Sequence, residues 1–363
     1  MDLAKALLYL ALYMQQLPPD FDAQSLQTPD VETTIQCYVS TVNSLVLVQE
    51  EMVCSSDGLE CLHMLGMIYI NEGAFRKAWL SFRRALDVAK IKGFRNSYAS
   101  SSRQGPSYKL AAQRRLWLDT IAGDCYLSLL LGLEPVLGSE PFGRNGDADD
   151  QHGNVDAKFE REFYPIVARL AKNRFLDQHD YEPAREIDRL LDELWDSMPG
   201  AWQRTPTLRL GRSFESAKDY SRLMCHLHFF LIRIFIHLPF AFSDGTGDQE
   251  YSKDRCLEAS RIILHWYFGL QKDGKGQPRC KIIDITAFLA AVTILLTEAG
   301  HGAATSRKQA YSSDRALLDQ FMHSQEALGL SCEREHIAKQ SATAFDTHNK
   351  AARVFDLAFS NER

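Results

Sequence analysis

The sequence predicts an all-α fold, a single large helical domain of about ten to twelve packed helices. Apolar residues recur every three or four positions along most of the chain, which is the spacing of amphipathic helices. No stretch alternates apolar and polar residues for long enough to indicate a sheet. The 363 residues are 45% hydrophobic, and Gly and Pro are few and scattered, so one large core is expected.

The expected helices follow one another from end to end. They span residues 2–16, 31–53, 57–70, 73–91, 107–132, 157–176, 182–197, 214–238, 250–270, 281–299, 313–328 and 334–358. The two long loops expected between them are 133–156 and 199–213. The first of these carries Gly143, Gly146 and Gly153 among several aspartates, which is typical of an exposed loop.

Two apolar segments resemble targeting or membrane signals but are interpreted as ordinary helices. The run 3–14 follows Asp2 and lacks both a basic n-region and a small-residue cleavage site, which argues against a signal peptide. The run 225–242 contains three histidines, Arg233 and Pro239, whereas a membrane span needs about 20 residues with few or no charges. The sequence therefore predicts a protein that is not secreted and makes no membrane contact.

One pair of expected helices forms a hairpin similar to a tetratricopeptide unit. Small residues at Gly66, Ala78 and Ala85 would let the two helices approach closely, and Tyr69 and Phe82 would fill the space between them. No second copy follows at the required period, so a single helical pair inside a larger stack is expected rather than a repeat array.

Two further helices are marked by their charges. Two arginines and Trp117 open the helix 107–132, and Asp124 then falls inside an apolar run. Trp117 and Tyr126 are expected to be core aromatics, with a place in a ligand pocket as the alternative. The helix 182–197 is expected to present a solvated, charged face. Its acids are Glu182, Glu186, Asp188, Asp192, Glu193 and Asp196, interleaved with Arg185 and Arg189.

Composition argues against several classes of function. The net charge is −6, from 41 basic and 47 acidic residues, and the basic residues form no tract, so direct nucleic-acid contact is not expected. The eight cysteines include no Cys-x-x-Cys, which argues against a zinc cluster or a disulfide scaffold. Signatures of a nucleophile elbow, a phosphate loop, a metalloprotease and a dinucleotide site are missing, and neither a metal nor a cofactor is expected.

The helix 214–238 holds the candidate site. His226, Phe230, Arg233 and His237 recur at i, i+4, i+7 and i+11, so they share one face of an otherwise apolar helix. A buried arginine requires an acid, because an unpaired buried charge is costly. The apolar helices 107–132 and 281–299 each supply one, and the expected partner of Arg233 is therefore Asp124 or Asp284.

Two interpretations of this face remain open. In the first, the groups form a satisfied polar lock between packed helices. In the second, Phe230, Arg233 and His237 line a ligand cavity together with Trp117 and Tyr126. In an enzyme, Arg233, His237 and His226 would donate protons or hydrogen bonds, and Asp124 or Asp284 would orient them. His226 and His228 stand two residues apart and point about 200° apart on a helix, which argues against a shared metal ion.

Several short motifs, in one order along the chain, resemble the fungal-specific transcription factor domain, also called the middle homology region of binuclear zinc-cluster regulators. The resemblance covers roughly residues 1–300. The matching pieces are Leu65-Gly66 with Tyr69 and Gly73, Ala78-Trp79, Arg83-Arg84-Ala85, Arg114-Arg115-Leu116-Trp117, Asp124, the run 129–135 (Leu-Leu-Leu-Gly-Leu-Glu-Pro), His237-Leu238-Pro239-Phe240, Cys256-Leu257-Glu258-Ala259-Ser260-Arg261 and Asp284-Ile285-Thr286-Ala287-Phe288.

The resemblance implies an all-helical regulatory domain over residues 1–363. The sequence departs from the family in having no six-cysteine zinc cluster and no DNA-binding domain, which fits either a truncated piece of a full regulator or a natural regulator that acts without binding DNA. Such a domain would sense an apolar small molecule or bind regulatory protein partners, in the nucleus, in the service of fungal secondary metabolism. The alternative is a helical shell repurposed as a cytoplasmic, cofactor-independent cyclase, Diels–Alderase-like or an isomerase, acting on an apolar terpenoid- or polyketide-like intermediate.

Overall fold

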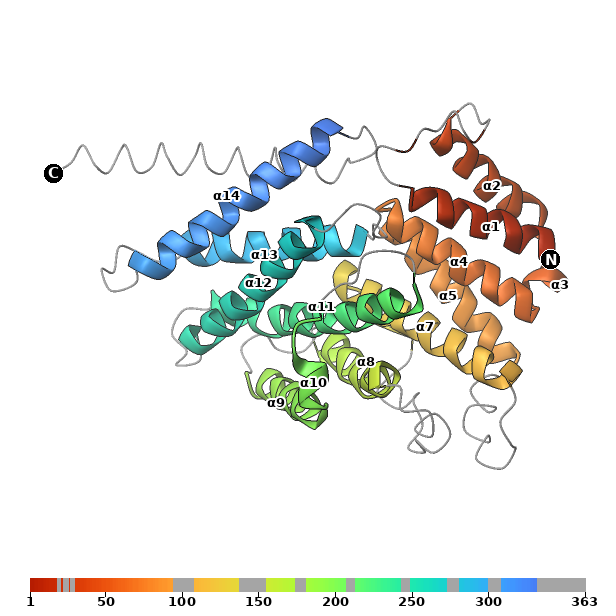
Figure 1. The fold of residues 1–363 in the computed structure, drawn as a ribbon. Coiled ribbons are helices and arrows are strands. Elements are labelled where there is room, and N and C mark those ends of the chain that lie inside the picture. Colours follow the sequence, from red (N-terminus) through yellow and green to blue (C-terminus); the bar gives the residue numbers. More distant parts are fainter. Residues whose placement is uncertain are drawn as a thin grey trace. The chain divides into compact units, whose positions relative to one another are not determined.

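The computed structural model describes residues 1–17, 21, 26, 30–93, 108–136, 155–173, 181–206, 213–242, 249–272, 281–299 and 308–331. Within these residues the chain forms thirteen helices and no strand, so the predicted all-α class is confirmed (Figure 1). Contacts group the chain into two compact units. The first comprises Met1–Ile236 with Lys275–Lys281, and the second comprises His237–Gly274 with Ile282–Arg363.

Helices α1 to α11 begin in the first unit. Their bounds are α1 Asp2–Gln15, α2 Val31–Leu45, α3 Glu50–Val53, α4 Ser56–Asn71, α5 Phe75–Ile91, α7 Tyr108–Leu131, α8 Val155–Asn173, α9 Glu182–Ser197, α10 Gly200–Gln203 and α11 Phe214–Ala241. The second unit contains the end of α11 together with α12 Gln249–Lys272, α13 Lys281–Ala299 and α14 Lys308–Ser331. The helix expected over 334–358 lies outside the described residues.

The single helix expected over 31–53 is wrong, because the chain turns after Leu45 and forms α2 and α3 separately. The backbone N–H groups of Val46 and Leu47 both donate to the carbonyl oxygen of Val42, which closes α2 in a tight turn. The Leu47 carbonyl then leaves the helical ladder and accepts a hydrogen bond from Arg84 Nη2 at 2.6 Å. The Arg84 side chain, 37 residues further along the chain, therefore holds the segment between α2 and α3.

The short helix α10 lies inside the expected loop 199–213. Pro199 precedes it with φ −57°, and the Trp202 N–H donates to the Pro199 carbonyl oxygen at 2.7 Å. Trp202 is buried, so this turn packs an indole into the core of the first unit. Propensity gave no signal for four residues with so little periodicity.

The tetratricopeptide-like hairpin forms as expected from α4 and α5. The Phe82 side chain is 1% exposed and lies against Gly66, where a Cβ atom would stand 2.6 Å from its Cζ. The same ring also contacts Gly123 of α7, where a Cβ atom would stand 2.8 Å from Cζ. One phenylalanine thus packs against glycines of two different helices, and the hairpin is extended to a three-helix layer.

Ion pairs connect the next helices of the first unit. Arg115 of α7 donates from Nη1 to Glu160 of α8 at 2.6 Å and from Nε to Asp119 at 3.0 Å. Trp202 of α10 donates from its indole to Asp156 of α8 at 2.6 Å. The arginine of the Arg-Arg-Leu-Trp motif therefore holds α8, and α8 in turn holds α10.

The second unit is built around α12 and α14. Arg261 makes a two-pronged pair with the buried Asp314, both hydrogen bonds being 2.7 Å long. The Tyr267 hydroxyl accepts hydrogen bonds from Gln271 and Gln325, each at 2.6 Å. These contacts explain why Asp314 and Gln325 are polar although they are buried.

Helix α11 is long and apolar enough to cross a membrane by length and composition. However, 67% of its most apolar window is buried inside the protein, as is usual for a core helix.

Most of the described cysteines are also buried. Cys61, Cys125, Cys225 and Cys256 are buried, and burial raises the pKa of the Cys61 thiol to about 11. Cys280 and Cys332 lie outside the described residues.

Candidate functional site

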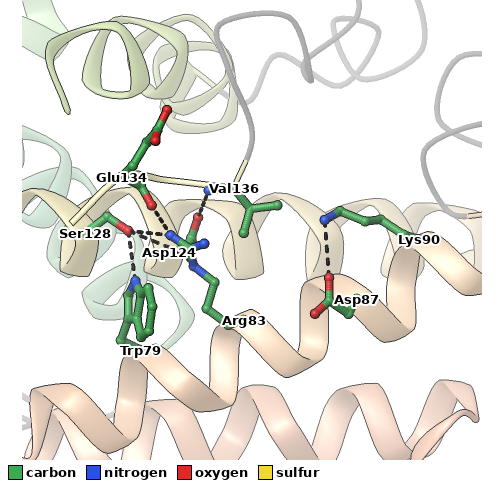
Figure 2. Close-up of polar contacts among 8 residues, drawn as sticks. All are labelled: Trp79, Arg83, Asp87, Lys90, Asp124, Ser128, Glu134 and Val136. Atoms are coloured by element: carbon green, nitrogen blue, oxygen red, sulfur yellow. Dashed lines mark hydrogen bonds and ion pairs between the residues drawn. The ribbon is translucent and has the colours of Figure 1, made fainter. Parts of the chain in front are cut away.

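A polar cluster in the first unit joins Arg83 of α5 to Asp124 of α7 (Figure 2). Arg83 Nε lies 2.5 Å from Asp124 Oδ1, and Arg83 Nη2 donates to the Ser128 hydroxyl at 3.2 Å and to the Glu134 carbonyl oxygen. Asp124 Oδ2 accepts the backbone N–H of Val136 at 2.9 Å. We call Arg83, Asp124 and Ser128 with the segment 132–136 the α5–α7 clamp.

Aromatic and helix-end geometry complete the clamp. The Arg83 guanidinium lies over the Trp79 ring at 4.3 Å, and the Trp79 indole donates to the Ser128 hydroxyl at 2.9 Å. Gly132 ends α7 with φ +68°, a conformation that glycine adopts readily. The chain that leaves α7 is thereby turned back so that both Glu134 and Val136 contact the ion pair.

Burial dominates the electrostatics of Asp124, which is 1% exposed. Desolvation raises the pKa of its carboxyl above the usual range, although the Val136 N–H and the Arg83 guanidinium both act to lower it. An acid in this position is costly without a partner, and the clamp supplies one charged and two uncharged donors.

Arg233 does not pair with Asp124, so that expectation is wrong. Its guanidinium pairs with Asp188, with Nε 3.4 Å from Oδ1, and with Asp192, both from α9, and it lies 4.7 Å from the Phe229 ring centre. Asp188 and Asp192 stand one turn apart, so both carboxylates face α11. The other expected partner, Asp284, belongs to α13 of the second unit.

The solvated face expected for α9 is therefore correct only in part. Asp188 is 3% exposed and serves Arg233. The acids Glu182, Glu186 and Glu193 do form exposed pairs with Arg185 and Arg189, as their spacing indicated. Sequence reasoning missed Asp188 and Asp192 as site residues because they look like the rest of a charged series. One feature of the sequence indicated that Asp188 is buried: it falls in register with the apolar positions Ala184, Ile187 and Leu191.

His226 lies two turns before Arg233 on α11 and is surrounded by aromatic side chains. Its ring centre is 4.9 Å from that of Trp195 and 4.6 Å from that of Trp202. Phe230 packs edge-on to Trp195 at 5.6 Å, so the shared face of 226, 230 and 233 is confirmed as the side toward α9 and α10. Burial, with a smaller contribution from the nearby Arg222 charge, lowers the pKa of His226 to about 4.

The remaining candidates have other neighbours. His237 is buried in the second unit, with Nδ1 3.3 Å from the Ser252 hydroxyl and its ring edge-on to Tyr251. Trp117 and Tyr126 are 1% and 7% exposed, so both are buried, and their place in a ligand pocket stays a prediction. Tyr126 lies 5.2 Å from His228, whereas His226 faces the tryptophans, so the two histidines point apart as expected.

The described side chains lack the cluster of ligands that a metal site requires. No group of three or more His, Cys, Asp or Glu is placed to hold a metal ion anywhere in the described part of the chain. Arg233 already has two carboxylates, and Asp124 already has Arg83. What the arrangement does chemically is hold helices together: α9 to α11 and α5 to α7. A role of these residues toward a ligand stays a prediction.

Comparison with known proteins gives the chain its relatives. No family model matches it, and no solved structure matches it. It is 26% identical over 94% of its length to a protein named transcription factor sdnS from Sordaria araneosa. Over 88% of its length it is 26% and 27% identical to proteins named dehydrocurvularin biosynthesis regulator from Alternaria cinerariae and Aspergillus terreus.

The chain spans less than half of each of these three proteins, 45%, 43% and 45% of their lengths. The matches run through nearly all of this chain and therefore include both compact units. The chain is thus similar, over almost its whole length, to fungal proteins that are named transcription factors and biosynthesis regulators.

Proposed function

We propose that this chain is a helical regulatory region of a fungal transcription regulator, and that it controls genes of a biosynthetic pathway from the nucleus. The observation that carries the proposal is the similarity to the Sordaria araneosa transcription factor over 94% of the chain. Two biosynthesis regulators from other fungi match over 88% of it, which supports a regulatory role for the same region.

We further propose that the region works through binding partners rather than through DNA contacts of its own. The net charge of −6 supports this, since a domain that binds nucleic acid by itself usually has a basic overall charge. The buried charges support it as well. Arg83 and Arg233 are both turned inward to carboxylates and are not available to phosphate groups. An apolar small molecule or a regulatory protein would supply the signal.

The test is deletion of the gene in its fungal host, with RNA levels of the neighbouring genes and a metabolite profile measured together. We expect the neighbouring transcripts to fall, and to return when the intact gene is restored. Unchanged transcripts with accumulation of one uncyclised intermediate, converted by the purified protein, would overturn the proposal in favour of the cyclase alternative.

A second arm links the phenotype to the structure. Restoring the gene with Arg83→Ala, which removes the centre of the α5–α7 clamp, should give less transcript than the intact gene at equal protein level. The matched control is Arg185→Ala, which removes an exposed arginine of α9 that pairs with Glu182 and lies over the Tyr181 ring. Equal rescue by both variants would show that the clamp plays no part in regulation.

A further inference from the structure

The outer side of α5 combines exposed apolar side chains with exposed cations. Leu80 is 60% exposed and Ile91 is 72% exposed, and Arg76, Lys77 and Arg84 are exposed as well. With 3.6 residues per turn these five positions fall within an arc of roughly 100°, which also contains the exposed Asp87. We call them the basic face of α5. The opposite side, with Ala78, Phe82 and Ala85, is buried against α4 and α7.

The cations on this face are balanced only in part, because Asp87, the acid on the same arc, pairs with Lys90, and Lys77 interacts at longer range with Glu72. In the described part of the chain no carboxylate lies within ion-pair distance of Arg76, Lys77 or Arg84, whereas the other two cations of α5 are paired, Arg83 with Asp124 and Lys90 with Asp87. Arg84 donates to the Leu47 carbonyl oxygen, and Lys77 lies 5.7 Å from the Tyr69 ring centre. Neither contact cancels a charge.

Leu80 stands at the centre of the three cations. Arg76 and Arg84 are one turn before and after it, and Lys77 is three residues before it, so all three side chains reach its surroundings. A single exposed leucine is ordinary on a protein surface. Leu80, however, has three cations as neighbours on a protein whose net charge is −6, and this combination is unusual for a single exposed leucine. It fits a partner that offers apolar and acidic groups together.

We propose that the basic face of α5 is a docking surface for an acidic amphipathic segment of a partner protein. Leu80 and Ile91 are eleven residues apart, about 16 Å along the helix, which matches two apolar side chains three turns apart on a docked helix. The acids of that segment would pair with Arg76, Lys77 and Arg84. This inference rests on the proposed function and specifies the kind of partner through which the region acts.

A nucleic acid fits this face less well. Phosphate groups would satisfy the cations but leave Leu80 and Ile91 in water, so the apolar part of the face would contribute nothing. A protein segment would contact both the cations and the apolar side chains, and Leu80 would then lie at the centre of the interface as its main apolar contact. Single-stranded DNA is therefore the informative competitor in a binding test.

The test is fluorescence anisotropy on the purified full chain with a synthetic labelled peptide. The peptide is a helix former with two leucines eleven residues apart, flanked by glutamates. A second peptide has the same composition with the leucines on opposite faces, and an oligonucleotide carries the same net charge. We expect the first peptide to bind at least about tenfold more tightly than either competitor.

Variants then locate the site. Leu80→Ser should weaken peptide binding by about tenfold or more, and the double change Arg76→Glu with Lys77→Glu should weaken it similarly and reduce its salt dependence. The matched controls are Leu3→Ser, which alters a leucine 73% exposed on α1, and Lys172→Glu, which alters an exposed lysine of α8. Both should bind as the unaltered chain does.

Two outcomes would overturn the docking surface: equal binding of Leu80→Ser and Leu3→Ser, or DNA binding as tight as that of the designed peptide. Because all these positions are exposed, thermal melting followed by circular dichroism should show that each variant folds. The peptide assay involves no transcription. A failure here with normal control of transcripts in the host would therefore reject this surface and leave the proposed function standing.

Discussion

Arg83 Nε and Asp124 Oδ1 lie 2.5 Å apart and connect two helices that are adjacent in the first unit but separated by some forty residues of chain. The arginine is partly exposed, whereas the carboxylate is 1% exposed and also accepts a hydrogen bond from the Val136 N–H. The pair thus fixes three segments at once: α5, α7 and the chain that leaves α7.

Replacing Asp124 by Ala should lower the free energy of unfolding by about 3 kcal/mol, because Arg83 would lose its carboxylate in a largely buried place. Urea unfolding of the purified protein measures this. The matched control is Asp87→Ala on α5, whose exposed carboxylate pairs with Lys90 in the described part of the chain, and a loss below about 0.5 kcal/mol is expected there. Similar losses for the two variants would contradict the structural importance of the clamp.

Replacing Arg233 by Met should cost about 3 kcal/mol of unfolding free energy, since Asp188 would remain buried without its cation. Adding Asp188→Asn to that variant removes the buried carboxylate charge and should recover part of the lost unfolding free energy. Chemical denaturation of the single and double variants gives the comparison. A double variant that is less stable than Arg233→Met would show that Asp188 is held by other groups.

Replacing Gly66 by Ala should destabilise the hairpin by about 1–3 kcal/mol, because the new methyl group would meet the Phe82 ring. Phe82→Leu in the same chain should relieve much of the clash, so the two changes together should be less harmful than their sum. Gly269→Ala on α12 is the control. Nothing lies within 4 Å of its Cβ position, and a gain of about 0.5–1 kcal/mol is expected. Additive losses at 66 and 82 would argue against the contact.

The unfolding free energy should fall as the pH drops from about 6.5 to about 4. Burial lowers the pKa of His228 from its usual 6.5 to about 4, so in this window the unfolded chain binds a proton that the folded chain does not. Stability is therefore fully present above pH 6.5 and decreases below it. Urea unfolding at pH 7 and pH 5 should show a smaller decrease for His228→Phe than for the unaltered protein. An unchanged decrease would place the cause in other groups.

Local chemistry explains which parts of the fold were predictable. Helical periodicity extends over many residues, so the long helices were identified from it, and α9 begins and ends at the expected residues. The hairpin was predictable for the same reason: Gly66 and Phe82 are a small and a large residue whose spacing within one motif indicates contact. The turn after Leu45 was not predictable, because the Arg84 side chain that accompanies it arrives from another helix.

The charged contacts also divide into a part that the local sequence predicts and a part that depends on contacts between helices. The sequence by itself determined that Asp124 and Arg233 would be buried and would need partners, because each lies in an apolar run and burying an unpaired charge is costly. Only the tertiary structure decided that Asp124 pairs with Arg83 and Arg233 with Asp188 and Asp192. The requirement for a partner is a property of one residue and its neighbours in sequence. The identity of the partner depends on which helices pack side by side, and that is set by the whole core.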